Sequence, residues 1–125
     1  MEILDLDLLR PDAKIIKLGG KKIDVSFIPC GITFDIDRIT REISTLNLKE
    51  VEAGGDETHR AFDLSIELCS IYCQTENPEM TPAWFEKHLN AQQINAMVTA
   101  IRETLYTGYK QVEGYSKNGE AVKTS

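Results

Sequence analysis

The residues of this chain best suited to bind a metal are its three cysteines and one histidine. Cys69 and Cys73 are spaced by about one helical turn, and Cys30 and His88 would complete a tetrahedral, closed zinc site. Structural zinc sites, however, usually place paired cysteines around a turn. Because Cys69 and Cys73 interrupt no apolar pattern, we expect them to pack as small hydrophobic side chains, without a metal or a cofactor.

Two histidines, His59 and His88, are the candidate general bases. Neither has a Ser, a Cys or a carboxylate near it in a recognisable catalytic motif, so histidines on helix ends are the better interpretation. Gly19-Gly20 is not followed by the GxxxxGK[ST] pattern of a phosphate-binding loop. The paired aspartates of the chain also lack the further oxygen ligands that calcium requires. We therefore expect no catalytic residues and no enzyme.

Trp84 and Phe85 lie in the stretch PEMTPAWFEKHLNAQQI, residues 78–94, and would either form a binding platform or fasten a short helix to the core. Thr81 followed by Pro82 is typical of a helix start, with Thr81 as the N-cap. Asn90 caps a second start, after which one apolar stripe runs to about residue 113. The stretch is best interpreted as a short helix, a sharp turn and a long helix, with the aromatic pair used for packing.

The N-terminal segment ILDLDLL alternates between leucines and aspartates up to Pro11. This period of two predicts a half-buried strand or an arm with one apolar side. Such a side must dock on its own hairpin as a third strand, on a sister subunit or on another protein. The candidate partner-binding residues are therefore Leu4, Leu6 and Leu8.

A β-hairpin is predicted where AKIIKL and KIDVSF flank Gly19-Gly20. Its loop has either the two glycines alone or the four residues GGKK. The longer loop would set Leu18 against Ile23 and Ile16 against Val25. We favour this second register because it pairs apolar residues on one face.

Two further helices are expected in the middle of the chain. Residues 33–46 alternate like a strand at their start but recur at helical spacing later, and their length favours a helix with Thr33 as N-cap. Residues 56–74 are apolar around most of a helical circumference, which is typical of a central core helix. The charged stretch between them is a loop. The sequence thus predicts a mostly helical α+β domain, in which an N-terminal hairpin, with an arm or third strand, packs against about four helices.

Composition restricts the partners. The chain has 125 residues, with 14 basic and 20 acidic side chains and a net charge of −6, so phosphate backbones and anionic lipids would be repelled. The N-terminus has neither a basic start nor a long apolar run, and the odd number of cysteines fits a reducing compartment, so we expect a cytoplasmic protein. We expect one domain over residues 1–114 and a disordered tail over 115–125.

The order of these parts resembles the tail assembly chaperones of long-tailed bacteriophages and prophages. The resemblance covers roughly residues 5–115, and its strongest part is PEMTPAWFEKHLNAQQINAMVTAIRETL, with a helix start, a short helix and a second start. It implies a non-catalytic protein of the bacterial host cytoplasm that binds the tape-measure protein and keeps it soluble, and whose longer form recruits tail-tube protein. The alternative is a structural neck or tail-completion protein that is present in the virion.

Overall fold

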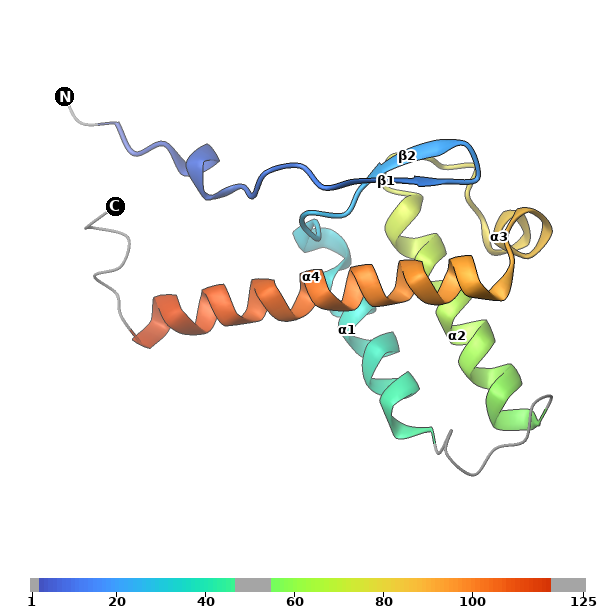
Figure 1. The fold of residues 1–125 in the computed structure, drawn as a ribbon. Coiled ribbons are helices and arrows are strands. Elements are labelled where there is room, and N and C mark those ends of the chain that lie inside the picture. Colours follow the sequence, from blue (N-terminus) through green and yellow to red (C-terminus); the bar gives the residue numbers. More distant parts are fainter. Residues whose placement is uncertain (1–2, 47–54, 118–125) are drawn as a thin grey trace.

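The computed structural model describes residues 3–46 and 55–117, and these form a two-stranded hairpin followed by four α-helices (Figure 1). The predicted fold class, a mostly helical α+β domain, is confirmed. In chain order the elements are η1 (Leu6–Leu9, a 3-10 helix), β1 (Ile15–Leu18), β2 (Lys21–Asp24), α1 (Cys30–Thr45), α2 (Asp56–Cys73), α3 (Pro82–His88) and α4 (Ala91–Lys117).

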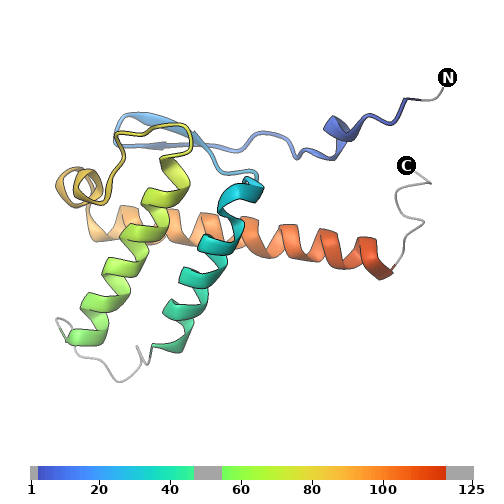
Figure 2. The ribbon, with the colours of Figure 1, turned by 180° about the vertical axis from the view of Figure 1, so that it is seen from behind.

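Helix α2 is the centre of the domain, as its nearly continuous apolar pattern predicts. It packs against α1, α3 and α4. Helices α1 and α2 run antiparallel, and α4 crosses both of them, while the hairpin lies where α1 begins and α2 ends (Figures 1 and 2). The C-terminal end of α4 continues past α1, with no other helix beside it among the described residues (Figures 1 and 2).

The hairpin adopts the register with the two-residue loop, so the predicted four-residue loop is wrong. Ile16 pairs with Ile23 and Leu18 pairs with Lys21. Gly19 and Gly20 have φ of 57° and 81°, and a tight hairpin turn with two such residues matches the twist of the flanking strands. Both registers place the apolar side chains on one face, so the turn geometry decides between them.

Hydroxyl groups of two helices bind the chain just after the hairpin. The Tyr72 hydroxyl donates to the carbonyl oxygens of Asp24 and Phe27 at 2.8 and 2.7 Å, and Thr104 Oγ1 of α4 donates to the Val25 carbonyl at 2.6 Å. Desolvation, followed by nearby negative groups, raises the pKa of Tyr72, which stays a donor. These bonds attach the hairpin to α2 and α4.

Helix α1 begins at Cys30, earlier than predicted, and Thr33 is not its N-cap. The Thr33 hydroxyl instead donates to the Pro29 carbonyl at 3.1 Å from within the first turn. Ile36, Ile39 and Ile43 are buried, so the helical spacing prevails over the strand-like alternation at the start of the segment.

The two predicted helix starts near Trp84 are confirmed. The Thr81 hydroxyl accepts from the Trp84 N–H at 3.3 Å. Asn90 and Gln93 bond each other's backbone N–H groups at 2.9 Å, which is a reciprocal capping arrangement. Helix α4 continues to Lys117, past the point where a disordered tail was expected. The rest of that tail, and most of the predicted loop between α1 and α2, lie outside the described residues.

Candidate partner-binding surface

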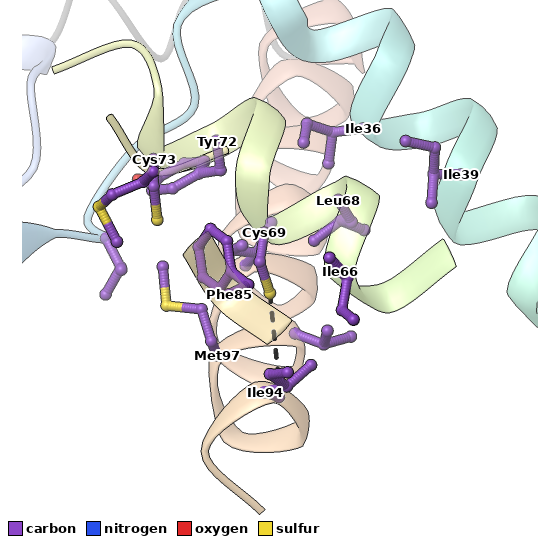
Figure 3. Packing of buried hydrophobic residues seen from close by; sticks show 14 of the residues in the cluster. Ile36, Ile39, Ile66, Leu68, Cys69, Tyr72, Cys73, Phe85, Ile94 and Met97 are labelled. Carbon is purple, nitrogen blue, oxygen red and sulfur yellow. Dashed lines mark hydrogen bonds between the residues drawn. The ribbon is translucent and has the colours of Figure 1, made fainter. Parts of the chain in front are cut away.

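The structure does not bring the candidate metal ligands together. Cys69 and Cys73 lie in the core of α2, where Cys69 packs beside Phe85 and donates weakly to the Ile94 carbonyl at 3.9 Å (Figure 3). Cys30 is exposed at the start of α1, and His88 is exposed at the end of α3. Among the described residues, no group of three His, Cys, Asp or Glu side chains could hold a metal ion. The thiols of α2 are packing groups, as expected.

Burial also makes the two α2 thiols unreactive. Desolvation raises the pKa of Cys73 to about 12 and that of Cys69 further, so neither forms a thiolate near neutral pH. We predict that a small disulfide reagent at neutral pH modifies one thiol per native chain, that of Cys30, and all three in denaturant. Cys30→Ser should reduce the native count to zero. Rapid native reaction of Cys69 or Cys73, or stoichiometric zinc in protein purified without chelators, would contradict this assignment.

The candidate site residues His59, Trp84 and Phe85 lie on two different helices, His59 on α2 and the aromatic pair on α3. His59 is exposed on α2. Phe85 is completely buried, and Trp84 packs edge-on against it, with ring centroids 5.2 Å apart. Trp84 also lies against Gly19 in the hairpin turn. The packing interpretation of the aromatic pair is confirmed, because it fastens α3 to the core and to the hairpin.

The N-terminal arm, residues 3–9, is the most exposed apolar part of the described chain. Of the two predicted alternatives, a half-buried strand and an arm with one apolar side, the strand does not form. Residues 6–9 form η1, and the Asp5 carboxylate caps it by accepting the Asp7 N–H at 3.0 Å. The alternative in which this segment docks on its own hairpin as a third strand is therefore wrong for the single chain. The large apolar side chains of the arm are between 58% and 84% exposed: Ile3, Leu4, Leu6, Leu8 and Leu9.

The base of the arm is fixed, which keeps its leucines away from the body. The Arg10 guanidinium lies over the Phe27 ring, 4.3 Å from the centroid. The Lys14 N–H donates to Asp24 Oδ1 at 3.2 Å. Although desolvation opposes it, hydrogen bonds from Ser26 and Lys14 lower the pKa of Asp24, so this acceptor stays ionised at neutral pH. From this anchor the arm extends along the same side of the molecule as the C-terminal end of α4 (Figures 1 and 2).

Three further aromatic residues are exposed and were not predicted as surface: Phe34 on α1, and Tyr106 and Tyr109 on α4. Phe34 is 86% exposed because it lies off the helical face that buries Ile36 and Ile39. Phe34 lies within the predicted helix of residues 33–46, and helical spacing from Ile36, Ile39 and Ile43 would have placed its side chain on the exposed face. Tyr109 continues the apolar stripe of α4, but beyond the end of the packed core. Partial desolvation and the neighbouring Asp37 carboxylate raise its pKa.

The chain matches no protein-family model, no curated protein and no solved structure. The resemblance to tail assembly chaperones therefore rests on the residues and the order of elements. Across residues 3–46 and 55–117, none of the helices combines the length and the apolar character needed to cross a lipid bilayer.

Proposed function

We propose that this protein is a non-catalytic chaperone that binds a long, helical, amphipathic protein and keeps it soluble. By the resemblance, the client is the tape-measure protein of a phage tail, tail-tube protein is the further partner, and the site of action is the cytoplasm of the bacterial host. The observation that carries the proposal is the arm, whose apolar side chains are held away from the core. A contiguous exposed apolar strip is typical of a surface that binds another polypeptide.

The charge of the chain supports the same function. An amphipathic client has an apolar face that a strip of leucines can cover, as in other helix-binding proteins. The net charge of −6 keeps a protein with such a strip from associating non-specifically. The arm itself combines both features, because its leucines are interleaved with Asp5 and Asp7.

The first test concerns the arm. With Leu4, Leu6 and Leu8 all replaced by Ser, we expect the co-purified client to fall by about tenfold or more, since three apolar contacts are removed. The free energy of unfolding of the monomer should change by less than about 0.5 kcal/mol, because the three side chains are exposed in the single chain. Both quantities are measured on the same preparations, by pull-down and by urea denaturation.

The matched control for the arm is Phe34→Ser with Tyr106→Ser, which removes exposed apolar side chains from the helices. This control should retain the client. If the arm variant keeps the client and the control variant loses it, the binding surface is on the helices and the arm has no such role.

The second test identifies the client and the class of protein. The proposal predicts a gene for a very long helical protein immediately downstream, and co-expression of that protein should make it soluble. It also predicts that this chain is absent from purified virions by mass spectrometry. Its presence there, in multiples of a ring symmetry, would instead support the structural neck or tail-completion protein.

A further inference from the structure

The outer face of the hairpin carries two lysines, and Asp24 is the acid of the strands that shares this face with them. Lys17 and Lys22 are directly opposite each other on the two strands, and both are exposed. Like charges at opposed positions destabilise a sheet unless anions compensate them. Within the described part of the chain neither lysine forms an ion pair. Asp24, the acid on this face, already accepts backbone N–H groups of Lys14 and Ser26.

The β1 strand also has an open edge. Lys14 and Val25 are a hydrogen-bonded pair of opposed residues, because the Val25 N–H donates to the Lys14 carbonyl at 2.9 Å. Because this pattern alternates along an antiparallel pair, Ile15 and Lys17 direct their backbone groups away from β2. No backbone or side-chain group of the described residues bonds to them there. Such an edge is a template for another strand, and Ile15 beside it is 56% exposed.

The sequence of the arm fits this edge. In an extended conformation Leu4, Leu6 and Leu8 point to one side, and Asp5 and Asp7 point to the other, together with Ile3 and Leu9. On the β1 edge the leucines would continue the apolar face of Ile16 and Leu18. The aspartates would then emerge on the face that carries the two lysines. Helix η1 is only four residues long and buries no side chain, so little structure is lost when it extends.

The arm of the same chain is poorly placed to do this. It runs directly into β1, and the contacts of Arg10 with Phe27 and of Lys14 with Asp24 hold the connection in place. Both views show the arm leading away from the hairpin (Figures 1 and 2). To lie beside β1 it would have to reverse direction within this anchored connection. The complementary arm must therefore come from another molecule.

We propose that residues 3–9 of a second copy of this chain add to the β1 edge as a third strand, with Asp5 and Asp7 facing Lys17 and Lys22. Reciprocal exchange of the two arms produces a closed, two-fold symmetric dimer. The inference rests on the hairpin and the arm alone and is independent of the proposed client. Because one arm cannot occupy two sites at once, the dimer and the client complex are alternative states.

Charge reversal tests the exchange. The first variant carries Asp5→Lys and Asp7→Lys, and the second carries Lys17→Asp and Lys22→Asp. Alone, each variant brings like charges together at both interfaces, so its dimer dissociation constant should rise by about tenfold or more. Mixed in equal amounts, the variants present opposite charges at both interfaces of the heterodimer, and dimers should return. Light scattering after size-exclusion chromatography measures the masses, and circular dichroism verifies that each variant is folded.

The matched control for the arm variant is Glu86→Lys with Glu103→Lys, which changes net charge equally on exposed helix positions. It should dimerise as the unchanged protein does. The proposal is overturned if the unchanged chain is monomeric at all concentrations, if either reversed variant dimerises as well as the control, or if the mixture stays monomeric. A monomer that still binds the client would reject the exchange and leave the chaperone function in place.

Discussion

Replacing Phe85 with alanine is expected to lower the free energy of unfolding by about 3–5 kcal/mol, as is typical for a large aromatic side chain lost from a core. Phe85 has no solvent exposure and lies against Cys69 and Met97 (Figure 3). Its ring joins α3 to the helices beneath, so its loss leaves a cavity that the surrounding helices fill only in part. Urea denaturation followed by circular dichroism measures the change.

The chain offers a control of the same residue type. Phe34→Ala removes the same atoms from a side chain that is 86% exposed, so the free energy of unfolding should change by less than about 0.5 kcal/mol. Similar losses for the two variants would show that Phe85 is not the packing centre described above.

Gly19→Ala is expected to lower the free energy of unfolding by about 2–4 kcal/mol, the sum of backbone strain and overpacking. Gly19 has φ of 57°, which L side chains rarely adopt. In addition, a Cβ atom at this position would lie 2.6 Å from Cη2 of Trp84. Either the turn or the tryptophan must shift, and both hold the hairpin on α3. Thermal or urea unfolding gives the magnitude.

The neighbouring glycine separates the two causes. Gly20 has φ of 81°, but a Cβ atom there would meet nothing within 4 Å, so Gly20→Ala should cost only about 1–2 kcal/mol, from strain alone. In a Trp84→Ala background, Gly19→Ala should cost about as little as Gly20→Ala, because the clash is gone. Equal costs for both glycines in the original background would contradict the role of Trp84.

Features that depend on local sequence were predictable. The helix starts at Thr81 and Asn90 follow from residue types that satisfy unpaired N–H groups, and the structure shows those bonds. The burial of α2 follows from its apolar circumference. The fold class needed only the order of such elements.

Features that depend on distant contacts were not predictable. The hairpin register was missed because both alternatives pair apolar residues. The turn that decides between them, with positive φ at Gly19 and Gly20, lies against Trp84, which is far along the chain. The arm was predicted as extended because a period of two does not reveal the Asp5 cap that favours a tight turn. For the candidate surface, the sequence identified the three leucines, whereas the open edge beside Lys17 required the register.

The central position of α2 has a consequence for the speed of folding. Most closely packed elements are neighbours in sequence, namely β1 with β2, α1 with α2, and α2 with α3. Little chain entropy is lost when such neighbours meet, and domains rich in local contacts fold within about microseconds to milliseconds. Helix α4 is the exception, because its Thr104 must find Val25 near the other end of the chain. During synthesis the face of α2 that packs against α4 therefore stays exposed to solvent until α4 leaves the ribosome. This is the stage most prone to aggregation.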